Sequence, residues 1–538
     1  MYRRYVSPLN NSGKIKAMNG MRQVRTMRLT AAFLLITLVA ACGPAPKKVV
    51  EVRVAEDDVV LARAASLAGE GHYAAFKKAV GLYRTLYGKR SLRAKVAAPY
   101  AQTALLLALR EKQVGLDSPA MVDEARKVIG ENSFLSAYED AAVLIARLPV
   151  RSRGVQRDIS TEGWDKQGAE RRATAEERLR SRAPSDEFSA AVLAAWSCSL
   201  GRHSEKWRDP ADILAPFPDS LLVRYEVAIC GQEDQAMLNG ILAAEPEFAE
   251  AHFHLGEAAL GERRLLEAEE HLLVAIRAIP ESPQPPILLA SIAFAIEEFD
   301  RSLPFYERAL ELSPEYRDAL LGKAICQAYL GRFDESMKTL EHILELGFWL
   351  IGESHYWLAW NLHELGRESD AISHIDEAKK RLPTNSHVFG LAGTLALNAG
   401  ELQRAESDFL ESLVHGPANT ESLFGLGTLC TRKSDWPRAA EFFDKAGRAY
   451  DAEAAALEVM IEEVRGSAMS AERKARLAAR RSKQLERIRL AGATSDYSAA
   501  AAFFNAGDPA AARRSAERAA AHPDMKEKAE ELLRSIKK

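Results

Sequence analysis

Small and large apolar residues recur in a fixed pattern over residues 249–446. One position is small in six successive copies, which lie 34, 34, 35, 34 and 34 residues apart: Ala268, Ser302, Ser336, Ala371, Ala405 and Ala439. Another small residue precedes each of these by twelve positions: Gly256, Ala290, Ala324, Ala359, Gly393 and Gly427. A large apolar residue follows each by four positions: Leu272, Tyr306, Leu340, Ile375, Phe409 and Phe443. Small residues let two helices approach closely while large ones fill the space beside them, so the pattern predicts a helix pair repeated six times.

Glycine and proline mark the ends of these predicted helices. A glycine, whose backbone accepts a positive φ, ends the first helix in three repeats, at Gly331, Gly366 and Gly400. Prolines stop the second helix in four repeats, at Pro280, Pro314, Pro383 and Pro417. Residues 347–351 (Gly-Phe-Trp-Leu-Ile) replace one of these proline turns, and such an apolar linker either packs into a neighbouring helix or marks a contact site.

In this register the small, aromatic, glycine and proline positions resemble the tetratricopeptide-repeat (TPR) family. The resemblance implies an all-α fold, a right-handed solenoid of antiparallel helix pairs, with the array over residues 216–450. It implies no particular function, because arrays of this kind bind many unrelated partners.

In TPR proteins the first helix of every repeat lines a concave groove, and the resemblance implies which residues line it here. The candidates for binding a partner are Phe253, Phe294, Tyr329, Tyr356, Trp360, His363, Asn398, Phe424 and Arg432. The resemblance also implies that Glu257, Ile287, Leu321 and Leu397 face the groove. Aromatic residues at helical spacing fit core packing equally well, so both interpretations stay open for each ring. The basic residues of a chaperone-type carboxylate clamp are missing from these places, which argues against that ligand.

Helical patterns also flank the array. Residues 57–215 predict an N-terminal helical domain with degenerate TPR-like hairpins, and residues 451–538 predict C-terminal helices with a last TPR and a polar capping helix. The helices predicted before the array cover residues 59–68, 73–87, 92–113, 119–129, 134–147, 169–182, 188–200, 220–230 and 234–244. Those predicted after it begin with residues 451–464 and 471–490.

Two charged stretches interrupt this regularity. The charged residues at 151–186 predict a polar loop followed by a solvated helix. The alternative is a loop that binds a partner, with Trp164 as its anchor. The helix at 471–490 carries eight Lys and Arg residues, which fit the exposed face of a solenoid helix. The alternative for this helix is binding to anionic lipid or to an acidic partner.

The amino terminus has the pattern of an export signal. Residues 1–41 contain seven Lys or Arg, no Asp or Glu, and an apolar core from Leu29 to Ala41 that is too short to cross a bilayer. The segment Leu-Val-Ala-Ala-Cys ending at Cys42 looks like a bacterial lipobox, which predicts lipid attachment at Cys42 and a flexible tether over residues 42–56. The alternative is a chance cysteine after an ordinary signal peptide. Translation starts at Met1, Met21 or Met27.

Charge and location follow from this segment. Loss of the seven leader charges reduces Lys and Arg from 72 to 65 against 75 Asp and Glu, a balance of −10. A mildly acidic chain is a poor candidate for binding nucleic acid. In the lipoprotein family, Gly43 rather than aspartate after the cysteine is typical of export to the outer membrane, so we expect a lipid-anchored protein facing the periplasm.

Four further cysteines form no C-x-x-C pair, so the sequence supports neither a zinc site nor a thioredoxin-like site. Cys326 and Cys430 fall at near-core positions and are expected to be buried. Cys198 and Cys230 both end predicted helices, and an oxidising periplasm would permit a bridge between them. The spacing alone leaves that bridge open.

The sequence contains none of the motifs of common enzymes: no H-E-x-x-H, G-x-S-x-G, Walker or dinucleotide loop. His252 and His254 do not share a helix face, and His271, His355, His363 and His374 are scattered along the array, where each is expected to be exposed or hydrogen-bonded. We therefore expect no catalytic residue, no cofactor and no metal.

Three functional classes remain. The first is a lipid-anchored periplasmic scaffold that binds a protein or peptide in the assembly of pili, secretion channels, outer-membrane proteins or the cell wall. The alternative is a periplasmic TPR component that handles a solute for a transport system, which a closed, aromatic-lined cavity would favour. An unrecognised enzyme is a third reading, because residues 59–215 match no known pattern.

Overall fold

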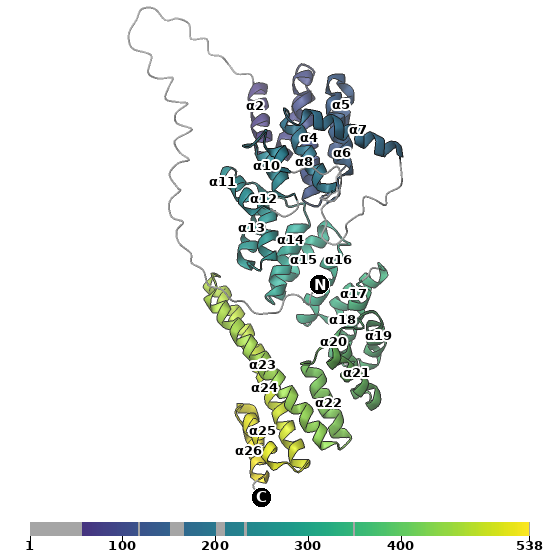
Figure 1. The fold of residues 1–538 in the computed structure, drawn as a ribbon, viewed down its shortest axis with the longest axis vertical. Coiled ribbons are helices and arrows are strands. Elements are labelled where there is room, and N and C mark those ends of the chain that lie inside the picture. The colour runs from purple at the N-terminus through teal and green to yellow at the C-terminus, as the bar shows by residue number, and fades with distance from the viewer. Residues whose placement is uncertain are drawn as a thin grey trace, which may run out of the picture. The chain divides into compact units, whose positions relative to one another are not determined.

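The computed structural model describes residues 56–116, 119–150, 166–200, 210–230, 234–347 and 350–536. Two units are distinguished, residues 1–63 and residues 64–538, and of the first only the start of α2 (Glu56–Gly69) is described. All regular elements of these residues are helices, with no strand, which confirms the all-α prediction (Figure 1). The lipobox with Cys42, the tether, Trp164 and the linker residues Phe348 and Trp349 lie outside the described residues.

The helices before the array follow the predicted bounds closely. They are α3 (Tyr73–Tyr87), α4 (Arg93–Gln113), α5 (Ala120–Glu131), the 3-10 helix η2 (Ser133–Tyr138), α6 (Glu139–Arg147), α7 (Lys166–Arg182), α8 (Glu187–Leu200), α9 (Pro210–Leu214), α10 (Leu221–Ala228) and α11 (Gln235–Ala244). One prediction is wrong, because residues 134–147 do not form a single helix. Their first part is η2, and an α-helix begins only where Glu139 and Asp140 supply acidic residues to its first turn.

The repeats form six helix pairs. These are α12 (Ala249–Gly261) with α13 (Leu265–Ala278), α14 (Gln284–Ala295) with α15 (Phe299–Leu312), α16 (Arg317–Tyr329) with α17 (Phe333–Glu345), α18 (Ile351–Glu364) with α19 (Glu368–Arg381), α20 (Ser386–Asn398) with α21 (Leu402–His415), and α22 (Thr420–Arg432) with α23 (Trp436–Gly466). All six small positions of the register are fully buried. A Cβ atom added to Gly393 would lie 2.5 Å from the ring of Phe409, and one on Gly427 would lie 2.6 Å from that of Phe443. The predicted small-to-large contact is therefore confirmed.

The turns inside the repeats also agree with the sequence. Gly331, Gly366 and Gly400 have φ values of 73°, 70° and 79°, the left-handed conformation that ends the first helix of each pair. Ser302 and Ser336 occupy equivalent positions, and their hydroxyls donate to the carbonyls of Ala290 and Ala324 at 2.8 Å. Each of these bonds ties the second helix of a repeat to the first.

The carboxyl-terminal helices differ from the prediction. Residues 451–464 are not a separate helix, because α23 runs without a break for 31 residues. Asp451 stands where four earlier repeats have a proline, so nothing stops the helix there. The next helix, α24 (Ala471–Asn505), returns beside it, followed by α25 (Pro509–Ala520) and the capping helix α26 (Pro523–Ile536). None of the described helices is both long and apolar enough to cross a membrane.

The N-terminal helices meet the array at a buried charged cluster, which we call the N-terminal junction: Arg110, Glu226 and Glu250. All three side chains are fully buried. The Arg110 guanidinium contacts Glu226, lies 3.5 Å from Glu250, and stacks 4.2 Å from the ring centre of Tyr225. Glu250 also accepts a hydrogen bond of 2.5 Å from the backbone N–H of Tyr73. The junction joins α3, α4, α10 and α12 through charge-assisted hydrogen bonds.

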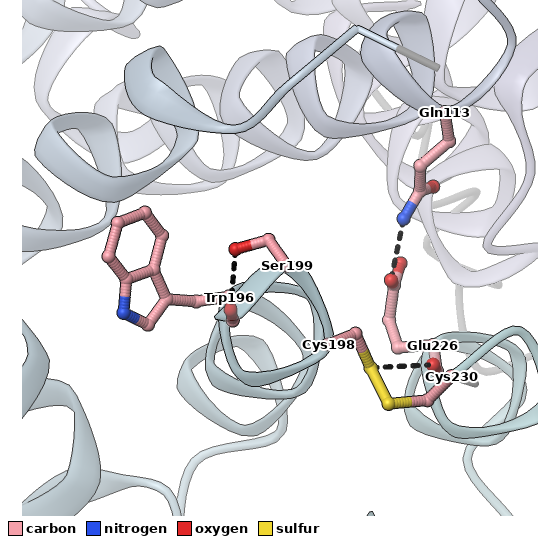
Figure 2. The surroundings of a disulfide bond; sticks show 6 residues. All are labelled: Gln113, Trp196, Cys198, Ser199, Glu226 and Cys230. Atoms are coloured by element: carbon pink, nitrogen blue, oxygen red, sulfur yellow. Dashed lines mark hydrogen bonds between the residues drawn. A yellow bond between two sulfur atoms is a disulfide. The ribbon is translucent and has the colours of Figure 1, made fainter. Parts of the chain in front are cut away.

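A disulfide lies beside this junction. Cys198 at the end of α8 is bonded to Cys230 after α10, with Cα atoms 5.2 Å apart (Figure 2). Glu226, one turn before Cys230, accepts a hydrogen bond of 2.6 Å from Gln113 on α4. Cys326 and Cys430 are free and buried, as predicted.

Candidate partner-binding surface

Seven aromatic side chains form a continuous surface on the second to fourth repeats, which we call the aromatic strip: Phe294, Phe299, Tyr329, Phe333, Tyr356, Trp357 and Trp360. Phe299 and Tyr329 stack face to face, with ring centres 4.4 Å apart and planes 5° from parallel. Tyr329 then meets Trp357 edge-on at 5.6 Å, and Trp357 meets Trp360 at 5.5 Å. Edge-to-face and offset-stacked rings at these distances attract one another.

The strip is accessible to solvent. Tyr329 is 52% exposed, and the six other rings are half-buried. Rings used only for packing are usually buried, as Phe409 is in the fifth repeat. The predicted candidates Phe294, Tyr329, Tyr356 and Trp360 therefore share one accessible surface, and Phe299, Phe333 and Trp357 are additions that their helical spacing did not single out.

The prediction for Phe253 is wrong. Its ring is 1% exposed and packs in the core with Leu272, Leu288 and Ile292. The same register position is buried at Ile287 and Leu321, because in the first three repeats it faces the neighbouring helices. Glu257 and Leu397 are buried too. Phe424 is half-buried and packs against Phe443, with ring centres 5.2 Å apart.

The polar candidates lie on the later repeats and are connected. Nδ1 of His363 lies 2.9 Å from Oε1 of Glu368, and the side-chain amide of Asn398 donates to the same oxygen at 3.1 Å. Arg432 donates to the backbone carbonyl of Leu397 at 2.8 Å. His363 is half-buried, whereas Asn398 and Arg432 are exposed. These residues link the first helices of three successive repeats along a polar edge.

Glu421 on α22 accepts a hydrogen bond of 2.9 Å from the hydroxyl of Thr394 on α20. Burial raises the pKa of Glu421. Burial also raises the pKa of Tyr356 on α18, and the nearby charge of Glu421 adds to the effect. Glu421 therefore lies near enough to the aromatic strip to act on it electrostatically.

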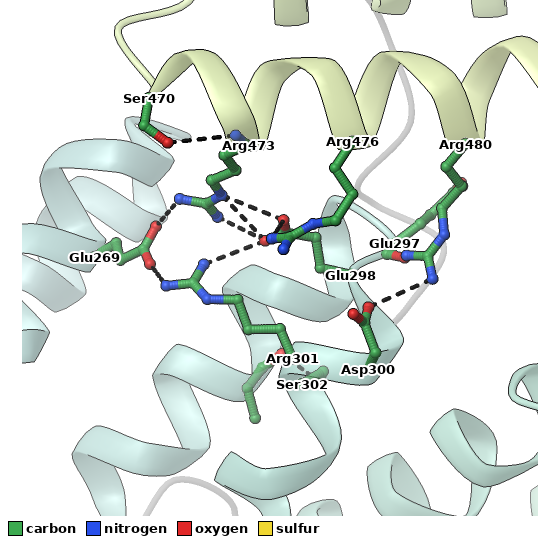
Figure 3. Close-up of polar contacts among 11 residues, drawn as sticks. Glu269, Glu297, Glu298, Asp300, Arg301, Ser302, Ser470, Arg473, Arg476 and Arg480 are labelled. Carbon is green, nitrogen blue, oxygen red and sulfur yellow. Dashed lines mark hydrogen bonds and ion pairs between the residues drawn. The ribbon is translucent and has the colours of Figure 1, made fainter.

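The basic helix contacts the array itself. Arg473 on α24 donates to Glu269 and Glu298, each at 2.7 Å, as Figure 3 shows. Arg476 lies 3.2 Å from Glu298, and Arg480 lies 3.4 Å from Asp300. We call these six residues the arginine clasp. The sequence offered an exposed face, anionic lipid or an acidic partner for this helix. The structure instead shows that Arg473, Arg476 and Arg480 contact acidic side chains of the chain's own first two repeats.

Apolar contact supports the clasp. Leu477 of α24 and Val464 of α23 are buried against Ile296, which follows α14. The guanidinium of Arg480 also lies over Phe299, 5.9 Å from the ring centre. Phe299 belongs to the aromatic strip, so α24 contacts the strip at this ring, while Tyr329 is exposed.

A cavity of about 310 Å³ lies elsewhere in the array. Its lining comes from α17, α18 and α19: Met337, Glu341, Leu358, Leu362, Arg367, Asp370, Ser373 and His374. No ring of the aromatic strip contributes to it. Within the described ranges, no group of three or more His, Cys, Asp and Glu side chains is arranged to hold a metal ion.

Comparison with known proteins identifies repeats in three stretches of the chain. Family models described as tetratricopeptide repeat match residues 235–283, 293–347 and 391–456. A UDP-N-acetylglucosamine–peptide N-acetylglucosaminyltransferase of Giardia intestinalis is 35% identical over 79 residues, which cover 15% of this chain and 5% of that enzyme.

Two solved structures are among those to which the chain is similar. YrrB, a TPR protein with an unusual peptide-binding site, is 24% identical, with a TM-score of 0.29 over 36% of this chain and 98% of its own. The Cut9–Hcn1 hetero-tetramer of APC/C is 12% identical, with a TM-score of 0.39 over 90% of this chain and 96% of its own. The matched stretches lie within the helix pairs described above and the helix that precedes them, and these parts of the chain are tetratricopeptide repeats.

Proposed function

We propose that this chain is a scaffold that docks a protein or peptide along the aromatic strip, while a lipid on Cys42 holds it to the periplasmic side of a bacterial outer membrane. Its partner would belong to the machinery that assembles pili, secretion channels, outer-membrane proteins or the cell wall. The proposal includes no catalytic step.

The exposed stack of Tyr329 on Phe299 carries the docking part of the proposal. Tyrosine and tryptophan supply most of the binding energy in many interfaces, since they offer a large apolar area with few rotatable bonds. Here neighbouring rings already hold Tyr329 in place. A partner that covered it would therefore bury apolar surface with little loss of side-chain freedom.

Matched variants test the docking surface. The partner is first isolated with the lipidated wild-type chain from its native envelope, and its affinity is then measured for Trp360→Ala and Tyr329→Ser. We expect each variant to bind more weakly by about 2 kcal/mol or more, as interface anchors do. Val414→Ser is the control, because Val414 is also an exposed apolar residue but lies on α21, away from the strip.

Thermal unfolding of the same proteins decides between docking and packing. Truncating a core tryptophan costs about 3–5 kcal/mol in the free energy of unfolding, whereas truncating a docking residue on the surface costs less. A severely destabilised Trp360→Ala protein, or a well-folded one with wild-type affinity, would count against the strip.

The anchor rests on the lipobox pattern alone and has its own test. Cys42→Ser is expected to leave an unprocessed precursor or to release the protein into the soluble fraction. A variant that is still cleaved after Ala41 and still sediments with membranes would refute the lipid anchor without affecting the docking surface.

A further inference from the structure

A carboxylate follows the rings of the fourth repeat along the array. Gly390 and Thr394 of the fifth repeat stand 34 residues after Tyr356 and Trp360, so each holds the register position of one of these rings. Glu421 of the sixth repeat lies against both of them. Its Oε1 accepts a hydrogen bond of 2.9 Å from the hydroxyl of Thr394, and a Cβ atom added to Gly390 would lie 3.2 Å from its Oε2. The positions that hold rings on α18 are therefore next to a negative charge on α20.

No cation of the chain pairs with this charge. Glu421 is exposed, and among the residues that the structure describes no Lys, Arg or His forms a salt bridge with it. The same holds, in that part of the chain, for Glu453 on α23. Burial raises the pKa of Tyr450, and the charges of Glu453 and Glu421 raise it further, so both carboxylates lie near this one ring. The surface next to the fourth repeat is thus negative and open to a cation from outside the chain.

Another ring of the aromatic strip already holds a cation of the chain itself. The guanidinium of Arg480 lies over Phe299, 5.9 Å from the ring centre, and 3.4 Å from the carboxylate of Asp300 (Figure 3). The face of an aromatic ring and a carboxylate beside it both attract a guanidinium. Tyr329 and Trp360 have no cation over their rings in the described part of the chain. The strip therefore combines a ring with a carboxylate in two places, and only one of them contains an arginine of the chain.

The basic candidates of the polar edge do not offset Glu421 directly. Arg432 stands eleven residues later on the same helix, about 16 Å away along its axis, and donates to the carbonyl of Leu397. His363 acts on Glu421 electrostatically, but its Nδ1 contacts Glu368. A negatively charged segment placed beside Glu421 would be repelled, whereas a positively charged one would be attracted.

We propose that the partner docks a segment that carries an arginine, whose guanidinium lies against the rings of the fourth repeat and pairs with Glu421, while apolar neighbours of that arginine cover Tyr329. This inference rests on the docking surface proposed above and adds the chemistry of what binds there. Arginine is favoured over lysine because a planar guanidinium can stack on a ring and donate hydrogen bonds from its edge at the same time. An ammonium group is more strongly hydrated and forms no such stack.

A library of random twelve-residue peptides displayed on phage tests the proposal with the full-length chain. We expect the wild type to select peptides with an arginine beside apolar residues. Tyr329→Ser should no longer retain these peptides, because it removes the exposed ring. Glu421→Gln, which has the same size without the charge, should select peptides in which arginine is no longer enriched. Glu411→Gln on α21 is the matched control, since Glu411 is an exposed glutamate near His415 and should leave the selection unchanged.

The affinity of one selected peptide, measured by fluorescence anisotropy, gives the size of the effect. Replacing its arginine by glutamine should weaken binding to the wild type about tenfold. The same replacement should have little effect on binding to the Glu421→Gln protein, because both changes remove the same contact. The peptide change alone keeps the test valid if circular dichroism shows that a variant of the chain is not folded.

The outcomes separate this inference from the docking surface on which it rests. Selected peptides that lack arginine but still need Tyr329 would overturn the inference and leave the docking surface intact. An equal loss on replacing the arginine in the wild type and in the Glu421→Gln protein would also overturn it. A library that yields no peptide dependent on Tyr329 would contradict both.

Discussion

Two charged contacts end on the first two repeats, and they differ in how far solvent reaches them. In the N-terminal junction, Arg110 and both of its carboxylate partners are fully buried. In the arginine clasp, Glu298 is buried but Arg473, Arg476 and Arg480 are 15%, 54% and 38% exposed. One contact is thus closed to water and the other is open at its edge.

The difference predicts how each contact fails. A buried charge left without its partner is costly, because the remaining charge has neither water nor a counter-ion. Charges at a solvent-exposed edge interact more weakly and are screened by salt. The junction should therefore respond to the loss of a partner and to pH, and the clasp to ionic strength.

The largest effect is expected from Arg110→Met at the junction. The variant leaves two carboxylates buried without a cation, and burial already raises the pKa of Glu226 and of Glu250. We expect a loss of about 3–5 kcal/mol in the free energy of unfolding, measured by chemical denaturation. Arg84→Met on α3 is a control, since Arg84 pairs with Glu124 but is 56% exposed. Equal losses for both variants would contradict the distinction drawn here.

Acid should weaken the junction through His72. This residue caps α3, with Nδ1 accepting the N–H of Ala75 at 3.4 Å, and burial followed by the charge of Arg110 lowers its pKa from 6.5 to about 4. Because the folded pKa lies below the unfolded value, the unfolded chain binds the proton first. Stability is therefore present above about pH 6.5 and is lost as the pH falls towards 4, by at most about 3 kcal/mol.

The variant His72→Asn separates the titration of His72 from that of other buried groups. Glu226 and Glu250 titrate with raised pKa values and act in the opposite direction. His72→Asn keeps a capping side chain but does not take up a proton. We expect the wild type to lose stability relative to this variant between pH 6.5 and 4. A difference that stays constant over this range would show that His72 is not the group responsible.

The smallest effect is expected at the clasp. Arg473→Ala removes charged hydrogen bonds to Glu269 and Glu298, and we expect a loss of about 1–2 kcal/mol at low salt. The loss should shrink in about 1 M NaCl, where charges are screened within about 3 Å. Arg465→Ala, whose residue pairs only locally with Glu462, provides the comparison. A loss of stability that does not depend on salt would show that the clasp, like the junction, is closed to solvent.

The sequence predicted the repeated part of this fold well because its determinants are local. A small residue and a large one sixteen positions later, such as Gly393 and Phe409, define a helix pair without reference to the rest of the chain. The long α23 was predicted wrongly as two helices, although Asp451 at the usual proline position was a signal that the helix continues.

The candidate site and the N-terminal junction were less accessible to sequence reasoning because both depend on distant contacts. Arg110 stands in a Leu-rich helix, and its partners lie 116 and 140 residues away. The burial of Phe253 and the exposure of Tyr329 depend on how neighbouring repeats stack, although both fall on first helices of the array. The contacts of His252 with His271 and of His355 with His374 were missed because each of them joins two different helices.

Stacked repeats usually touch only their neighbours, so such an array opens from either end, one repeat at a time. The clasp joins Arg473 to Glu298, and every helix from α15 to α23 lies in the loop that it closes. The last repeat cannot unfold from its end without first breaking the contact between Arg473 and Glu298. Re-forming that contact has to close a loop of 175 residues, which costs chain entropy. The middle of the array is therefore expected to exchange its amide hydrogens as one cooperative unit.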